Sequence, residues 1–360
     1  MIAAALAASA VNAQVGSGQV PAEASAAAIV DPAWQVPRTS WGHPSLEGTW
    51  STDDMRSVPR ERPAQFGDRQ KLTPEEFAER AAADEETRNF HVNEQGFSRR
   101  GEAGTRTFGY TSLVIDPSDG RTPAMTEAGL ARAAPSDRGS FGPGPFDSLE
   151  DFTLYDRCIT RGILGSQFPV VYGNGLRVVQ TVDSVAISYE MIHDTRVIKL
   201  GERPHMDDGV RQYLGNSRGY WDGDTLVVET RNLTDMTSIG GNGNGTRHSE
   251  AMTIMERFTR VDPEMIEYVA TIEDPVTYTA PLTVRMMYTT QPGYRIYEYS
   301  CHEGNGAVRN SLTGERDFEQ RVAEAIANGD PIPERVTPIH EETYIEDPES
   351  IDFFDINAGE

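Results

Sequence analysis

From Leu176 onward, apolar and polar residues alternate in short runs, a pattern that is typical of half-buried β-strands. Turn residues separate the runs at short intervals, and residues 221–224 (Trp-Asp-Gly-Asp) predict a tight hairpin. The expected strands are 111–116, Leu176–Thr181, Ser184–Ile192, Thr195–Leu200, Thr225–Thr230, Met252–Val261, Met265–Glu273, Leu282–Thr289 and Tyr294–Ser300. This series predicts a mainly β fold, an antiparallel barrel or strongly curved sheet.

Two helices are predicted beside the sheet. Thr73 and Glu76 form a capping-box pattern with Pro74 in the first turn, so a helical insertion is expected over residues 73–89. Near the end of the chain, apolar residues four apart predict a helix over Glu315–Asn328 that ends at Gly329. We expect this helix to pack over one barrel end or the outer face of the sheet. Residues 131–150, rich in Gly, Pro and Ser, predict a surface loop.

The two ends of the chain differ in composition from the middle. Residues 1–13 are an Ala-rich apolar run with small residues at its end, which is typical of a secretory signal peptide, although the first basic residue is Arg38. Residues 14–44 predict a linker and residues 330–360 an acidic tail, with one β-rich domain over 45–329. We therefore expect a periplasmic or secreted protein.

Charge and cysteine content narrow the class further. With 32 Lys and Arg against 56 Asp and Glu, the net charge of −24 disfavours nucleic acid and anionic membrane surfaces as partners. No apolar run approaches the length of a spanning helix, and the oligomeric state stays open. Cys158 and Cys301 would pair in an oxidising compartment; two buried free thiols are the alternative.

Candidate chemistry begins at the strand Ser184–Ile192. This strand carries Tyr189, and His193 and Asp194 stand at its end. An imidazole oriented by a carboxylate is suited to general base catalysis, and Asp194 as a simple turn former is the alternative. Arg196 would share the face of His193 and hold a carboxylate or a developing oxyanion; an ion pair with Glu190 is equally consistent.

Further polar residues lie on a loop and near the hairpin. His205 with Asp207 or Asp208 would suit a divalent metal, but no metal-binding spacing is present, so we expect no metal and no cofactor. Arg218 and Trp221 near the hairpin are candidates for ligand binding.

The segment from Tyr294 to Asn305 returns aromatic and charged residues to the sheet. Tyr299, His302 and Glu303 lie within five residues of one another, which is unusual for a core strand. If the segment is a strand, Glu298 and His302 share one face. We therefore expect part of a polar site here.

Several motifs together resemble a family of secreted bacterial proteins without a settled activity. They include Glu190–Arg196 (EMIHDTR), Trp221–Val228 (WDGDTLVV) and Tyr297–Asn305 (YEYSCHEGN). The pattern also has His248-Ser249, which matches, and a second histidine where this chain has Thr253; if that histidine is catalytic, this protein is altered. The resemblance implies a folding unit with a polar cluster, not a reaction. Gly48-Thr49-Trp50 is more weakly similar to the opening of lipocalin-like barrels, and a plain core tryptophan is the alternative.

Two functional hypotheses follow. The first is a cofactor-independent lyase, hydrolase or isomerase that acts on a small organic or sugar-derived substrate by histidine acid–base catalysis. Its candidate catalytic residues are His193, His205, His248, His302, Arg196 and Tyr189, with Arg218, Glu303, Tyr299 and Trp221 in binding roles. The alternative is a lipocalin-like protein that binds a small apolar ligand without turnover. A structural envelope protein with a satisfied polar network is a third possibility. An enzyme requires at least two of the histidines at one accessible pocket.

Overall fold

The computed structural model describes residues 34–93, 104–136, 145–170, 172–243, 245–291 and 293–335. The expected signal peptide and most of the expected acidic tail lie outside these ranges. Residues 34–44, expected as the end of a linker, lie against the barrel, where Val36 is buried and Arg38 pairs with Asp224. Within the described ranges, no helix has the length and apolarity needed to cross a bilayer.

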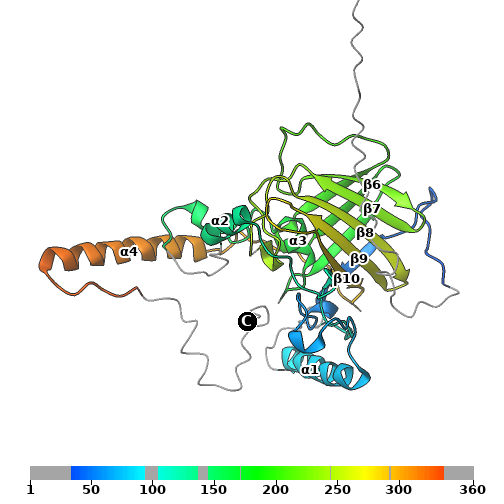
Figure 1. The fold of residues 1–360 in the computed structure, drawn as a ribbon, viewed down its shortest axis with the longest axis horizontal. Helices are drawn as coiled ribbons and strands as arrows, with labels where there is room; N and C mark the ends of the chain where they lie inside the picture. The colour runs from blue at the N-terminus through cyan, green and yellow to red at the C-terminus, as the bar shows by residue number, and fades with distance from the viewer. Residues whose placement is uncertain are drawn as a thin grey trace, which may run out of the picture.

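The strands form a closed barrel, as the alternating pattern predicts (Figure 1). Their order is β1-β3-β4-β5-β6-β7-β8-β9-β10, and β1 also pairs with β10, which closes the ring. β2 adds to the same edge of β10. The bounds are β1 (Gly48–Ser51), β2 (Val114–Asp116), β3 (Gly175–Gln180), β4 (Ser184–Tyr189), β5 (Thr195–Leu200), β6 (Asn216–Asp222), β7 (Thr225–Arg231), β8 (Thr253–Asp262), β9 (Met265–Glu273) and β10 (Leu282–Thr289).

One pair departs from the expected antiparallel arrangement. β5 and β6 run parallel, with Lys199 opposite Arg218 and Leu200 opposite Gly219. A parallel pair needs a long crossover connection, and the loop from Gly201 to Gly215 provides it. The barrel is therefore mixed rather than wholly antiparallel.

The expected strand Tyr294–Ser300 is absent, and the segment runs as irregular backbone. The reason lies in the neighbours of β10, which pairs with β9 on one edge and with β2 and β1 on the other. No edge of β10 is left for a further strand, so alternation alone overpredicted the sheet. Hydrogen bonds to the Glu190 carboxylate hold this segment in place instead.

Four α-helices accompany the barrel in the described chain. They are α1 (Pro74–Asn93), α2 (Glu127–Ser136), α3 (Gly162–Gln167) and α4 (Ala307–Asn328). The capping box of α1 is confirmed: the Thr73 amide donates to Glu76 Oε2 over 2.7 Å, and the Glu76 amide donates to Thr73 Oγ1 over 3.3 Å. α2 occupies the start of the region expected as a loop.

The C-terminal helix begins earlier than predicted but ends as predicted, because Gly329 adopts the left-handed conformation with φ 73°. α4 runs away from the barrel in Figure 1 rather than over it. Ile326, expected on its buried stripe, is 65% exposed. The predicted packing of this helix on the barrel is therefore wrong for its C-terminal half.

The short helix α3 is buried along its whole length against the barrel interior. Gln167 Nε2 donates to the Tyr189 hydroxyl over 3.0 Å, and the Tyr288 hydroxyl donates to Gln167 Oε1. A Cβ at Gly165 would lie 2.3 Å from the Gly243 amide nitrogen, so glycine is required where Gly240 and Gly243 approach α3. α3 thereby positions the residues just before it, which form the site.

Candidate functional site

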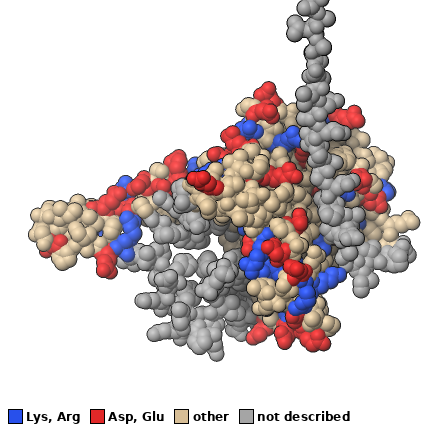
Figure 2. All heavy atoms as spheres, viewed as in Figure 1, with Lys and Arg blue, Asp and Glu red and all other residues tan. Residues whose placement is uncertain are grey.

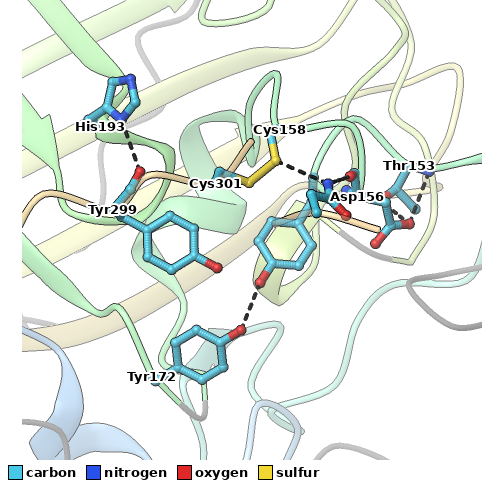
Figure 3. Close-up of a disulfide and its surroundings, with 9 residues drawn as sticks. Thr153, Asp156, Cys158, Tyr172, His193, Tyr299 and Cys301 are labelled. Carbon is cyan, nitrogen blue, oxygen red and sulfur yellow. Dashed lines mark hydrogen bonds between the residues drawn. A yellow bond between two sulfur atoms is a disulfide. The ribbon is translucent and has the colours of Figure 1, made fainter. Parts of the chain in front are cut away.

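Three segments that are distant in sequence meet at one disulfide, residues 153–161, 190–194 and 294–305. Cys158 and Cys301 are bonded, with their Cα atoms 5.7 Å apart, which confirms the predicted pairing (Figure 3). We call this meeting point of the three segments the disulfide junction. It unites the stretches that carry the EMIHD and YEYSCHEGN motifs.

Side-chain hydrogen bonds hold the return segment where the strand was expected. The Tyr297 amide donates to Glu190 Oε1 over 3.3 Å, and the Tyr294 hydroxyl donates to the other oxygen of the same carboxylate. His193 Nδ1 lies 3.2 Å from the Tyr299 carbonyl oxygen, as Figure 3 shows. Glu190 is 8% exposed, so a buried carboxylate holds the return segment in place. This segment forms no β-ladder hydrogen bonds that would otherwise fix its backbone.

The backbone at the junction is unusual. Among described non-glycine residues, Cys158, Ile192, His193 and Asn232 have positive φ, and the first three lie at the junction. The left-handed conformation is costly for a β-branched residue such as Ile192, whose φ is 63°. This turn ends β4 at Tyr189, earlier than the strand predicted to Ile192. Strain of this kind is concentrated at ligand sites in many proteins.

Arg161 lies beneath the junction and is 1% exposed. Its Nη1 donates to the Gly173 carbonyl oxygen over 3.1 Å, whereas Nε and Nη2 have no hydrogen-bond partner among the described residues. Burial lowers the pKa of Arg161 to about 10, so the guanidinium is still charged at neutral pH. Sequence reasoning missed this residue, because an arginine after Cys158-Ile159-Thr160 looks like an ordinary surface charge.

Three tyrosines, Tyr155, Tyr172 and Tyr299, lie close enough to Arg161 to interact with its charge. The hydroxyl oxygens of Tyr155 and Tyr172 are 3.4 Å apart, and the rings of Tyr172 and Tyr299 have centroids 6.5 Å apart (Figure 3). Burial, together with the Tyr172 hydroxyl, raises the pKa of Tyr299 to about 12, and burial raises the pKa of Tyr155 further. Tyr155 and Tyr299 are thus neutral phenols at physiological pH, and their hydroxyls can donate hydrogen bonds.

A cavity of about 590 Å³ opens on the other side of the disulfide. Asn305 connects the two sides, because its Nδ2 donates to the Asp156 carbonyl oxygen over 2.9 Å and lies 3.4 Å from Cys158 Sγ. The cavity is formed by the start of α4, the disulfide turn and the Cys158 segment. Its lining consists of Leu149, Arg157, Ile159, His302, Asn305, Val308, Arg309, Leu312 and Thr313.

Two predicted catalytic residues lie inside the barrel instead. Arg196 forms a bidentate ion pair with Glu256, at 3.1 and 2.6 Å, and the Tyr268 hydroxyl donates to the same carboxylate over 2.9 Å. The side chains of Arg196 and Glu256 are 2% and 0% exposed. Tyr189 is also buried, and burial raises its pKa well above the ordinary value of a phenol. Arg196 alternates inward with Ile198 and Leu200, so its ion-pair partner is Glu256 across the barrel rather than Glu190.

His248 is a buried structural residue. Its ring nitrogens lie within hydrogen-bond distance of Thr237 Oγ1 and the Ser249 carbonyl oxygen, and burial lowers its pKa. The Ser249 hydroxyl donates to Asp274 over 2.6 Å rather than to the imidazole. Thr253, which stands where the resembling family has a histidine, is half-buried at the start of β8.

The remaining predicted residues gather around β6 and β7. His205 Nε2 lies 3.1 Å from Glu229 Oε2, and Arg218 Nε donates to the Pro204 carbonyl oxygen over 2.9 Å. Trp221 packs against the His43 ring, with centroids 5.6 Å apart. Glu303, by contrast, is exposed in the disulfide turn. The described residues contain no group of three or more His, Cys, Asp or Glu that suits a metal ion.

The structure therefore places the four predicted histidines in four separate surroundings. His193 contacts a backbone carbonyl at the junction, His302 lines the cavity, His205 contacts Glu229, and His248 is buried. Sequence reasoning located the junction through His193, Tyr299 and His302, but it overestimated how many imidazoles meet there.

Comparisons with known proteins add little to this geometry. No family model matches the chain, and no curated protein matches it in sequence. Among solved structures, the crystal structure of a mutant of the fluorescent protein UnaG aligns with 38% of this chain and 84% of its own chain. The aligned residues are 15% identical and the TM-score is 0.21. The fold assignment accordingly comes from the strand pairing, and the functional argument from the site.

Proposed function

We propose that this protein binds a small organic anion with an apolar body, without chemical turnover, in the cavity beside the disulfide junction. The volume of about 590 Å³ lies in the range of pockets that enclose small molecules. The observation that carries the proposal is the composition of the lining, which combines aliphatic side chains with two arginines.

The aliphatic part of the lining comes from both walls of the cavity. Leu149 and Ile159 belong to one wall, and Val308 and Leu312 face them from α4. Burial of an apolar ligand surface against such side chains contributes about 25 cal/mol per Å² before the costs of binding. This part of the lining favours a hydrocarbon body.

The charged part of the lining favours an anionic group. Arg157 and Arg309 line the cavity, and neither forms an ion pair with a carboxylate of the described residues. Acidic residues outnumber basic ones by 56 to 32 in the chain and spread over the face seen in Figure 2, whereas Arg157 and Arg309 bring two positive charges to this cavity. Asn305, His302 and Thr313 supply further polar groups at the same cavity.

Acid–base catalysis by a histidine pair is the weaker proposal. It requires two imidazoles at one accessible pocket, and of the four candidates His302 alone is part of this lining. Binding without turnover needs no such pair. The two arginines also change the expected ligand from a purely apolar molecule to one that carries a negative charge.

A titration with decanoate tests the proposal, with decyltrimethylammonium as the cation of similar apolar length. By isothermal titration calorimetry at constant ionic strength, decanoate should bind at least tenfold more tightly than the cation. Leu312→Trp, which places a bulkier ring in the cavity, should weaken binding at least tenfold, whereas Ile326→Trp on the exposed far part of α4 should leave it unchanged. Equal affinity for the two amphiphiles, or an unchanged affinity of the Leu312→Trp variant for decanoate, would contradict the proposal.

We also propose that the protein works in the periplasm or outside the cell. The apolar run at residues 1–13 and the disulfide support this location, since disulfides persist in oxidising compartments. Fractionation of a bacterial host that expresses the full chain tests it. A periplasmic protein with a mature N-terminus near Gln14 is expected, and an unprocessed cytoplasmic protein contradicts it.

A further inference from the structure

Arg161 and its three tyrosines form a polar cluster that is separate from the cavity of the proposed function. None of Arg161, Tyr155, Tyr172 and Tyr299 lines that cavity. Arg161 is also more deeply buried than any cavity residue of the same charge, because Arg157 is half-buried and Arg309 is exposed. A buried cation without a carboxylate partner needs an explanation in a folded protein.

The two unsatisfied nitrogens of Arg161 lie on the same edge of the guanidinium. Nε–H and the adjacent Nη2–H are parallel donors, spaced to meet both oxygens of one carboxylate. The Gly173 carbonyl occupies Nη1 at 3.1 Å and so fixes the plane of the group. The structure thus leaves open the pair of donors that makes a bidentate contact with a planar anion.

We propose that this edge of Arg161 is a binding site for the carboxylate group of a small organic acid, completed by hydroxyl donors from Tyr155, Tyr172 and Tyr299. The three tyrosines are partly exposed, whereas the guanidinium is buried, so a carboxylate bound at this edge lies in a site with little water. In such a site the contact between guanidinium and carboxylate is stronger than at the surface.

The disulfide makes this site dependent on the return segment. Tyr155 and Arg161 flank Cys158 in sequence, while Tyr299 lies two residues before Cys301. Bonding of the two cysteines therefore brings the third phenol to the guanidinium. The carboxylate site should exist only in the oxidised protein.

Acetate is the probe that tests the site, because it is too small to need the aliphatic cavity. Near-ultraviolet difference absorption of the tyrosines, recorded at constant ionic strength, should change saturably as acetate is added. Arg161→Lys removes the bidentate edge and should weaken acetate binding at least tenfold. Arg177→Lys, an exposed arginine on β3, serves as the matched control and should bind acetate as the wild type does.

A second variant keeps the test decisive if Arg161→Lys does not fold. The double variant Tyr172→Phe/Tyr299→Phe removes two hydroxyl donors, keeps the rings, and should weaken acetate binding at least threefold. Absence of a saturable response in the wild type, or unchanged affinity in both variants, would overturn the proposal. Decanoate binding in the cavity should persist in Arg161→Lys, so this site and the proposed function can fail separately.

Discussion

Two buried arginines in this protein have opposite surroundings. Arg196 lies inside the barrel, where Glu256 accepts two hydrogen bonds from it. Arg161 lies at the disulfide junction, where no described carboxylate meets it and two of its nitrogens have no partner. Burial lowers the pKa of both groups, but Glu256 raises the pKa of Arg196 above its ordinary value, whereas the pKa of Arg161 falls to about 10.

The difference separates a structural charge from an available one. Within the barrel, Glu256 accepts hydrogen bonds from Arg196 and Tyr268, so a buried carboxylate compensates the arginine charge even though Arg196 Nε has no partner among the described residues. At the junction, tyrosines rather than a carboxylate interact with the arginine charge. We infer that the ion pair between Arg196 and Glu256 stabilises the folded barrel. The unpaired edge of Arg161 is instead available to bind an anion from solution.

Removal of the disulfide should produce the largest effect on this comparison. Cys158→Ala/Cys301→Ala opens a loop with a sequence separation of 143, which costs about 5 kcal/mol in the chain-entropy model. Urea unfolding measures the loss. The acetate response should disappear with it, because Tyr299 is no longer held near Arg161; a variant that remains folded and binds acetate normally contradicts the role of the junction.

Breaking the completed pair should have the next largest effect. Glu256→Gln leaves the Arg196 charge buried and should cost about 3–5 kcal/mol of unfolding free energy in urea. The double variant Arg196→Met/Glu256→Met removes both charges and should recover most of this loss. If Glu256→Gln lowers the unfolding free energy by less than about 1 kcal/mol, Glu256 does not stabilise Arg196 in the way that distinguishes it from Arg161.

Arg161→Met should be much milder in buffer without carboxylates. The variant loses one hydrogen bond to Gly173, worth about 1 kcal/mol, but it also relieves an unpaired buried charge. Added acetate should then separate the two proteins, since a ligand at one hundred times its dissociation constant stabilises the wild type by about 2.7 kcal/mol. Equal stabilisation of the variant by acetate points to another site.

The smallest expected effect is that of pH near neutrality on the affinity for acetate. Binding needs the deprotonated acid, present above about pH 5, and the protonated Arg161, whose pKa is about 10. Affinity should therefore be constant from about pH 6 to 9 and fall about tenfold per unit above pH 10. Difference absorption at fixed ionic strength measures this, and a decline that begins below pH 9 identifies a different group.

The sequence predicted the barrel well where local rules are sufficient. β9 and β10 have the predicted bounds, because alternation and the flanking turn residues define both ends. The Thr73 capping box is equally local. Tyr294–Ser300 alternates in the same way but forms no strand, since both edges of β10 are already paired. A local sequence pattern does not show whether a sheet edge is still free to pair with another strand.

The site was only partly predictable for a related reason. Motifs and the two cysteines located the junction, but the partner of Arg196 comes from β8, across the barrel, rather than from neighbouring Glu190. Arg161 carries no local pattern at all. Its role depends on α3, Gly173 and Tyr299 meeting in space, and such contacts emerge only from the folded chain.

The most direct test of the account observes the two arginines in one experiment. In protein labelled with ¹⁵N at arginine Nε, resonances assigned by Arg161→Lys and Arg196→Lys are followed during an acetate titration. We predict a saturable shift of the Arg161 Nε–H resonance and a stationary Arg196 resonance. If the Arg161 resonance stays in place, or both move together, the open edge of Arg161 is not an anion site.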